Sequence, residues 1–305
     1  MTSIWVDTDF GFDDLWALLL LRAHGCQIAG VSLVAGNTPL AQVAENARRA
    51  KSAYNFDWPV WQGAARPLVR KPDTAERVLG LTGMRSRGAA LPPTSATKPD
   101  TGAVEALRAW LCAENGGTRK VLALGPLTNI ALLLQKAPQA AQRIERLVWM
   151  GGSIGHGNHT PLAEFNAVAD AEALAAVAGH AIGRDIVDLM FCRQVTFAED
   201  EIPDTDQLTG DLLGGYLDIA LERGRSCMAI YDPLAALALA KPDSISFSPC
   251  RLTVSTAQDE TYGATLMTET QSSKIRVATH PAARLSQICL RALNEEALHG
   301  ARQQS

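Results

Sequence analysis

The acidic stretch VDTDFGFDD, residues 6–14, places four carboxylates within eight positions, at Asp7, Asp9, Asp13 and Asp14. Carboxylates this close repel one another and raise each other's pKa unless a cation neutralises them. Because the stretch contains no cysteine or histidine, its ligand atoms are oxygens, which favour hard ions such as Ca²⁺ or Mg²⁺. The spacing differs from the calcium loop of an EF-hand, which needs a longer series of oxygens ending in glutamate.

The elements around this stretch explain how it would be positioned. SIWVD at residues 3–7 is an apolar run typical of a buried strand, and the leucine-rich pattern over residues 13–24 predicts a helix. In α/β sheets, ligands bind beyond the carboxyl ends of the strands. Asp13 and Asp14 then begin the helix, where its dipole favours each negative charge by roughly 0.3–1 kcal/mol. Capping of a helix explains one such aspartate, but not four together.

The same alternation of apolar runs and helical patterns continues along the chain. Strands are predicted at residues 28–36, 120–125, 146–152 and 186–190, and helices at 40–54, 126–137 and 170–178. Continuously apolar strands that alternate with helices predict an α/β fold with a mostly parallel central sheet flanked by helices. Residues 80–102 and 151–161, rich in Gly, Pro, Ser and Thr, are predicted to be surface loops. With no low-complexity linker in between, we expect a single domain over residues 1–305.

A metal ion seldom takes all its ligands from one loop, so other strand ends should contribute. Leu124 offers a backbone carbonyl at the end of a predicted strand, directly before Gly125 and Pro126. Asp232 lies in YDP, ahead of Pro233 and an apolar helical run. An aspartate in that position is ordinarily a helix cap.

Composition excludes several classes of function. The chain has 28 basic and 32 acidic residues, a formal charge of −4, and no basic run, so no nucleic-acid surface is expected. Its six cysteines lack paired spacing, which argues against a zinc or redox motif and for reduced thiols. The beginning of the chain lacks the pattern of an export signal, and the longest apolar run, LWALLLL, is too short for a membrane span. We therefore expect a cytoplasmic protein without a membrane partner.

Several of these motifs together resemble one known family. VDTDFGFDD resembles the DTDxGxDD signature of the inosine–uridine preferring nucleoside hydrolases. Further pieces follow in the order typical of that family: VAGN (34–37), LGPLTNIA (124–131), MGG (150–152), GNHTPLAEFN (157–166) and YDP (231–233). The resemblance covers residue 3 to about residue 240. It implies a Rossmann-like α/β domain that binds one Ca²⁺, hydrolyses the N-glycosidic bond of ribonucleosides in purine or pyrimidine salvage, and forms a homo-oligomer, a dimer or a tetramer.

The resemblance also implies a role for individual residues. The metal ligands would be Asp9, Asp14, Asp232 and the Leu124 carbonyl, with Asp9 also the general base for the attacking water. Asp13 would bind a ribose hydroxyl, Asn37, Asn158, Glu164 and Asn166 would contact the sugar, and Met150 would line the pocket. These residue types suit the reaction, because carboxylates stabilise a ribosyl cation-like transition state and Ca²⁺ lowers the pKa of a water.

The match departs from the family on the side of the leaving base. Many members carry His directly before the Asp that corresponds to Asp232, where this chain has Tyr231. Members also carry a second His in a loop nearer the start of the chain, and this His is replaced near Leu79. A purine-specific branch has Trp at the position of Tyr231 and activates the base by stacking, which Tyr231 resembles more closely. The segment DLMFCRQ at 188–194 replaces a common Asp-Val-Thr. The preferred base and the acid for the leaving group therefore stay open, and an enzyme for a modified nucleoside is a second interpretation.

Two other classes of protein are alternatives to a hydrolase. Haloacid-dehalogenase-type phosphatases also place DxD after their first strand and use Mg²⁺, and release of phosphate from a monoester would identify them. A non-catalytic, calcium-dependent ribose- or nucleoside-binding protein would bind ribose without turnover.

Overall fold

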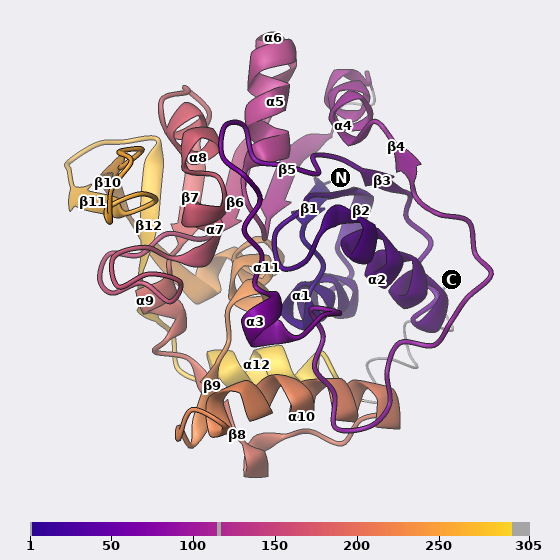
Figure 1. Cartoon of the computed structure of the whole chain (residues 1–305). Coiled ribbons are helices and arrows are strands. Elements are labelled where there is room, and N and C mark those ends of the chain that lie inside the picture. Colours follow the sequence, from indigo (N-terminus) through magenta and orange to yellow (C-terminus); the bar gives the residue numbers. More distant parts are fainter. Residues whose placement is uncertain (1, 115–116, 295–305) are drawn as a thin grey trace.

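The central feature of the computed structural model, which describes residues 2–114 and 117–294, is one large sheet with helices on both faces (Figure 1). Its strand order is β11-β10-β12-β7-β6-β5-β1-β2-β3-β4, and a separate small sheet pairs β8 with β9. The strands from β7 to β4 run parallel, as does the pair β12 and β7, whereas β10 is antiparallel to β11 and β12. The predicted α/β class with a mostly parallel central sheet is confirmed.

The strands and helices have the following bounds. The strands are β1 (Thr2–Thr8), β2 (Gln27–Leu33), β3 (Val60–Gln62), β4 (Asp100–Thr101), β5 (Thr118–Ala123), β6 (Arg146–Met150), β7 (Arg184–Val187), β8 (Thr196–Ala198), β9 (Cys227–Ala229), β10 (Ile245–Val254), β11 (Thr265–Glu269) and β12 (Ile275–Pro281). The helices are α1 (Phe12–Ala23), α2 (Leu40–Ala53), α3 (Glu76–Leu79), α4 (Ala103–Cys112), α5 (Thr128–Lys136), α6 (Pro138–Ala141), α7 (Phe165–Ala169), α8 (Ala171–Ala178), α9 (Leu189–Cys192), α10 (Gln207–Leu221), α11 (Asp232–Ala240) and α12 (Leu285–Arg291). Short 3₁₀ turns cover Glu199–Glu201 and Pro242–Ser244.

Two hydrophobic cores lie on the two faces of the sheet. Side chains alternate along β1, so that Ile4 and Val6 join the core around α1 and α11, whereas Trp5 joins the core under α4, α5 and α8. Helix α1 is buried on all sides from Leu15 to Leu21, because α11 packs against it and the side chain of Trp16 donates a hydrogen bond to the Cys289 carbonyl in α12. Its nearly continuous apolar run is therefore explained by central burial.

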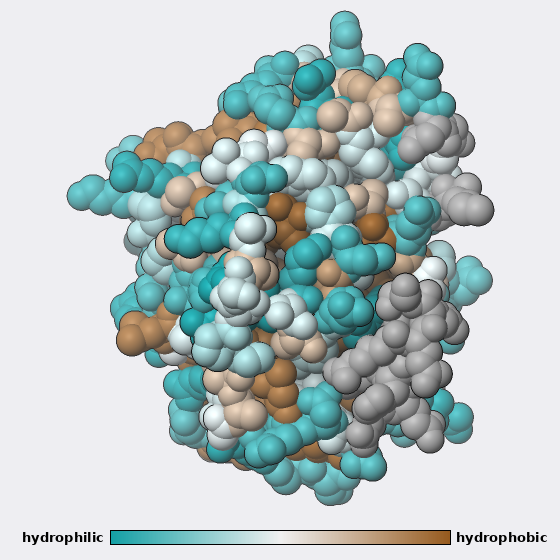
Figure 2. All heavy atoms as spheres, turned by 90° about the vertical axis from the view of Figure 1, so that its right-hand side faces the viewer, coloured by the Kyte–Doolittle hydropathy of each residue, from teal (hydrophilic) through white to brown (hydrophobic). Residues whose placement is uncertain are grey.

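The outer surface gives no sign of a membrane-spanning element. Among the described residues, no helix is both long and apolar enough to cross a membrane. On the face that carries α2 and α4, apolar residues form small, separate groups among hydrophilic ones (Figure 2). Scattered apolar residues of this kind are usual on the surface of a folded domain.

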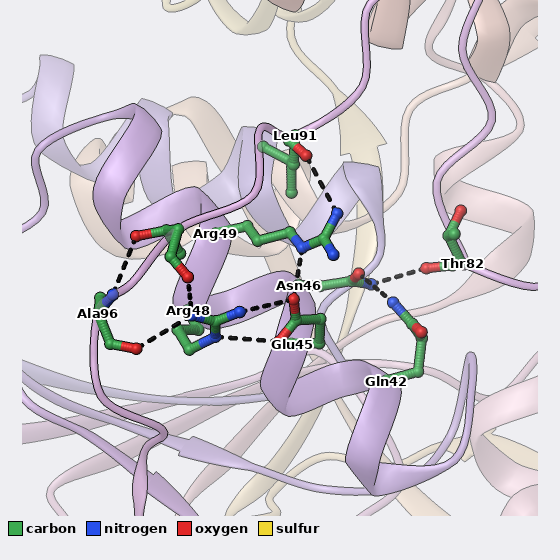
Figure 3. Close-up of polar contacts among 9 residues, drawn as sticks. Gln42, Glu45, Asn46, Arg48, Arg49, Thr82, Leu91 and Ala96 are labelled. Carbon is green, nitrogen blue, oxygen red and sulfur yellow. Dashed lines mark hydrogen bonds and ion pairs between the residues drawn. The ribbon is translucent and has the colours of Figure 1, made fainter.

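Helix α2 holds the long connection between β3 and β4 against the body of the protein (Figure 3). Arg48 donates hydrogen bonds to the carbonyls of Thr94 and Ala96, and Arg49 donates one to the Leu91 carbonyl. The amide of Asn46 reaches the carbonyls of Thr82, at 2.7 Å, and of Phe10, at 3.1 Å. Asn46 thus ties this connection to the acidic stretch that follows β1.

Replacement of Asn46 by Ala should lower the free energy of unfolding by about 1–3 kcal/mol, because two carbonyls of a buried site lose their donor. Chemical denaturation followed by circular dichroism measures this change. Gln42→Ala is the matched control, since Gln42 is half-buried and its amide contacts only Asn46 within the same helix. Equal losses in the two variants would contradict the role given to Asn46.

Candidate active site

The acidic stretch forms a tight turn between β1 and α1 that fixes Asp14. Phe10 adopts a left-handed backbone conformation with φ of 46°, and Gly11 precedes the first turn of α1. The hydroxyl of Thr8 donates to one carboxylate oxygen of Asp14 at 2.5 Å, and the Gly11 N–H donates to the other at 2.7 Å. Asp14 is fully buried and held in one orientation by these two donors.

Three carboxylates from two distant segments meet in front of this turn. Asp13, Asp14 and Asp232 each contribute an oxygen that lies within 4.8 Å of the others. Asp232 is the first residue of α11, with Pro233 after it, as expected for the start of a helix. This cluster brings together two parts of the chain that are more than two hundred positions apart in the sequence.

Asp9 reaches the same place from the end of β1. Its carboxylate accepts the N–H of Asn37 at 2.7 Å, while the side-chain amide of Asn37 lies 3.3 Å from Asp14. A Cβ atom at Gly36 would sit only 2.1 Å from Asp9, so the glycine of the VAGN segment leaves the space that this carboxylate occupies. The VAGN segment therefore positions Asp9 through its glycine and its asparagine.

Without a neutralising charge these carboxyl groups resist ionisation. Burial, followed by the charge of Asp14, raises the pKa of Asp9 well above its usual range and the pKa of Asp13 to about 7. Burial and the charge of Asp13 likewise raise the pKa of Asp232. A divalent cation fits this donor set, because it would return the carboxyl groups to their charged form and because oxygen is the ligand that hard ions prefer.

The carbonyl of Leu124, a residue that directly follows β5 and lines the same cavity, is the fourth predicted ligand. It accepts a hydrogen bond from the amide of Asn166 at 2.7 Å, and the same amide lies 3.0 Å from the Met150 carbonyl at the end of β6. A carbonyl oxygen has a second lone pair, so this contact leaves Leu124 able to coordinate an ion. Asn166 therefore joins the ends of two neighbouring strands.

Glu164 and Asn158 shape the wall of the cavity opposite α1. Glu164 caps α7 by accepting the N–H groups of Asn166 and Ala167, and it also accepts the Gly152 N–H at 2.8 Å. Burial raises the pKa of Glu164 to about 7. The side-chain oxygen of Asn158 accepts the Phe165 N–H at 2.9 Å. Helix capping thus fixes the position of two polar side chains that the sequence assigned to the sugar.

These groups surround a cavity of about 560 Å³. Of the predicted site residues, it is lined by Asp9, Asp13, Asn37, Leu124, Met150, Asn158, Glu164, Asn166, Tyr231 and Asp232. Asp14 is not among the lining residues, but one of its oxygens lies within 4.8 Å of oxygens of Asp13 and Asp232. The structure therefore brings ten of the eleven predicted residues to one cavity and the eleventh close to two of them.

Several residues of the cavity were missed by the sequence analysis. The hydroxyl of Tyr216, in the middle of α10, donates to Asp13 at 3.2 Å. His159, assigned only to a loop, lines the cavity and lies 2.9 Å from Asp73. Ile219, Met228, Arg77, Arg193, Arg223 and Arg225 also line it. Tyr216, Ile219, Arg223 and Arg225 belong to no motif. Helix α10 contacts the site through the Tyr216 hydroxyl and through the packing of the Tyr216 ring against Phe12 in α1.

Comparisons with known proteins agree with this geometry. The sequence model of the family described as "Inosine-uridine preferring nucleoside hydrolase" matches residues 4–295. The chain is 35% identical over 272 residues to the non-specific ribonucleoside hydrolase RihC of Escherichia coli strain SMS-3-5, which covers 87% of each chain.

Solved structures show the same fold. The inosine-uridine preferring nucleoside hydrolase from Bacillus anthracis aligns with a TM-score of 0.72 and 25% identity, over 96% of this chain and 99% of the other. The purine-preferring ribonucleoside hydrolase from Gardnerella vaginalis aligns over 100% of both chains with a TM-score of 0.87 and 19% identity, a likeness of fold alone.

A divalent cation should stabilise the metal-stripped protein, because it offsets the repulsion among the clustered carboxylates. At a Ca²⁺ concentration of about one hundred times Kd, we expect a gain of roughly 2.7 kcal/mol in the free energy of unfolding, measured by thermal denaturation. Asp232→Asn should reduce this gain, whereas Asp243→Asn, a change at an exposed aspartate outside the cavity, should not. A protein whose stability is the same with and without every divalent ion tested would contradict the metal site.

Proposed function

The chain belongs to the inosine-uridine preferring nucleoside hydrolase family and is a ribonucleoside hydrolase, and we propose that it depends on Ca²⁺ to cleave the N-glycosidic bond. The products are ribose and a free base. We also propose that residues 1–305 act as one domain, that the enzyme forms a dimer or tetramer, and that it works in the cytoplasm. Family membership favours this function over the phosphatase and the non-catalytic binding protein.

The observation that carries the proposal is the meeting of Asp13, Asp14 and Asp232 beside a cavity that Asp9 also lines. Asp9, Asp14 and Asp232, together with the Leu124 carbonyl, are the proposed ligands of the ion. When bound, Ca²⁺ supplies Lewis acidity, which lowers the pKa of a water and fixes its position. Mg²⁺ demands a stricter octahedral geometry with shorter bonds, so a site assembled from three aspartates and a carbonyl suits the larger ion better.

Asp9 is the proposed general base. It lines the cavity, and its carboxylate is oriented by the Asn37 N–H at 2.7 Å. A carboxylate within hydrogen-bond reach of the attacking water takes up the proton as the glycosidic bond breaks. The surrounding negative charges stabilise the positive ribosyl group that develops in the transition state.

The sugar is proposed to lie between the acidic floor and α7. Asp13, steadied by the hydroxyl of Tyr216, would accept a hydrogen bond from a ribose hydroxyl. Asn37, Asn158, Glu164 and Asn166 would contact the other polar groups of the sugar, with Met150 against its ring. Fixed contacts of this kind lower the barrier by holding the substrate in its reactive orientation.

The base is proposed to face the wall that carries Tyr231, Met228 and Ile219. Burial raises the pKa of Tyr231 to about 12, so its hydroxyl is a poor proton donor at neutral pH. Stacking of its ring on the base is the role that its position supports. An aromatic face binds a flat base well, and a purine offers more stacking area than a pyrimidine.

A ribose-release screen over common nucleosides tests the proposal. Ribose should appear with Ca²⁺ present, disappear after chelation, and return when Ca²⁺ is added again. Inorganic phosphate from a phosphomonoester, or binding of nucleosides without any release of ribose, would contradict it.

Replacement of Asp9 by Ala should lower kcat by about a thousandfold or more, since general base catalysis contributes roughly 10²–10⁴-fold. Circular dichroism should show an unchanged fold. The matched control is Asp243→Ala, which should keep the full rate. Normal turnover in the Asp9 variant would defeat its assignment as the base.

Replacement of Tyr231 by Ala should reduce kcat/KM by about tenfold for purine nucleosides and by less for pyrimidine ones, because stacking is worth roughly 0.5–1.5 kcal/mol beyond burial. Tyr231→Phe keeps the ring and should retain most of the rate for both. Equal losses for both classes of base would refute selectivity by stacking.

A further inference from the structure

Charged side chains of both signs line the cavity. The acids are Asp9, Asp13, Glu164 and Asp232, and the arginines are Arg77, Arg193, Arg223 and Arg225. An uncharged nucleoside would use the acids and the ion proposed to bind there, but it offers no partner for four guanidinium groups. The lining therefore points to a ligand that carries a negative group in addition to its ribose.

The arginines that line the cavity come from separate segments of the chain. Arg223 and Arg225 follow the end of α10, and β9 then leads directly from Arg225 toward Tyr231. Between them Gly224 has a φ of 72°, which favours glycine, and the Arg225 N–H closes the turn on the Ala220 carbonyl at 3.1 Å. Arg77 belongs to a different part of the chain, helix α3.

Three of these arginines have no anionic partner of their own. Within residues 2–114 and 117–294, the side chains of Arg77, Arg223 and Arg225 form no ion pair or hydrogen bond. The nearby acids are already engaged: Glu222 pairs with Arg85, and Asp218 pairs with Arg87. These three arginines are exposed and have no ion-pair partner among the described residues, so their guanidinium groups are available to a ligand.

Arg193 has a different function from the other three. Its guanidinium donates to the carbonyls of His156 and Gly157, and so holds the loop that precedes Asn158. Carbonyls do not neutralise its charge, so Arg193 adds to the positive potential of the cavity while it positions the loop.

We infer that the enzyme prefers nucleosides whose base carries a carboxylate-bearing substituent on the edge remote from the ribose, with Arg223 and Arg225 as the residues that select it. This inference rests on the ribonucleoside hydrolase function proposed above. Guanidinium groups bind carboxylates through paired, charge-assisted hydrogen bonds, which makes arginine the suitable residue for such a group. A cavity of about 560 Å³ has room for a substituted base beside the sugar.

Arg225 lies near the residue that is proposed to stack on the base. Burial raises the pKa of the Tyr231 hydroxyl, and the charges of Arg193 and Arg225 both have a smaller, opposite effect that lowers it. Met228, in β9 shortly after Arg225, lines the same cavity. A negative group on the base would therefore meet Arg225, and adenosine 5′-monophosphate in the test distinguishes a phosphate on the sugar.

The test compares charged substrates with uncharged substrates of the same shape. One pair is N6-(1,2-dicarboxyethyl)adenosine and its dimethyl ester, and the other is 5-carboxymethyluridine and its methyl ester. Adenosine, uridine and adenosine 5′-monophosphate complete the set, and kcat/KM is measured by ribose release. We expect each acid to exceed its ester by roughly tenfold, as one favourable charge contact of about 1.4 kcal/mol would give, and high salt should reduce the difference.

Variants assign this preference to residues. In the double variant that combines Arg223→Ala with Arg225→Ala, the ratio of kcat/KM for the acid to kcat/KM for its ester should fall to about one. Arg225→Lys should retain part of the preference for the acid, because the positive charge remains. Arg251→Ala is the matched control, an exposed arginine on β10 that does not line the cavity, and should keep the ratio of the unaltered enzyme.

The outcomes separate this inference from the proposed function. Release of ribose from adenosine or uridine with a ratio of about one would overturn the inference and leave the hydrolase function intact. A preference for adenosine 5′-monophosphate would assign the arginines to a phosphate and would also overturn it. Failure to release ribose from every nucleoside would overturn the proposed function, and the inference with it.

Discussion

The repulsion among buried carboxylates at the end of β1 is the constraint on which the rest of the site depends. Burial raises the pKa of Asp9, Asp13, Asp14 and Asp232 above the usual range, and the charges of neighbouring acids add to this for Asp9, Asp13 and Asp232. Such an arrangement is unfavourable for an empty protein and favourable for one that binds a hard cation. The local loss of stability is therefore the expected cost of the proposed ion site.

The fold makes this arrangement tolerable by distributing the acids over rigid elements. The turn after β1 is held by hydrogen bonds of Thr8 and Gly11, and α1 behind it is buried from Asp14 to Leu21. Asp232 enters from the first turn of α11, the helix that packs against α1. Because both helices direct their N-terminal ends toward the cluster, their dipoles add a further favourable interaction with the negative charge.

The sequence predicted those parts of the site that are encoded by continuous motifs. Asp9 and Asp14 stand out because several acidic residues lie close together in the sequence, and Asn37 stands out with its neighbours in VAGN. The predicted helix at 13–24 differs from α1 by one residue at each end. Tyr216 and Arg225 carried no such signal, because they are ordinary helix and turn residues. Tyr216 reaches the site through the packing of its ring on Phe12 of α1 and its hydrogen bond to Asp13. The antiparallel strands β10, β11 and β12 were also missed, since their mixed apolar and polar residues resemble loops.

Neighbouring aspartates of identical chemistry differ in what they are able to do because their surroundings differ. Asp14 accepts hydrogen bonds at both carboxylate oxygens from Thr8 and Gly11, so it is held in one orientation with an oxygen within 4.8 Å of Asp13 and Asp232, which suits a metal ligand. Asp9 lines the cavity and, among the described residues, receives a hydrogen bond from only one other residue, Asn37. Its carboxylate therefore keeps the capacity to accept a proton from water, which is why the base is assigned to Asp9 and not to Asp14.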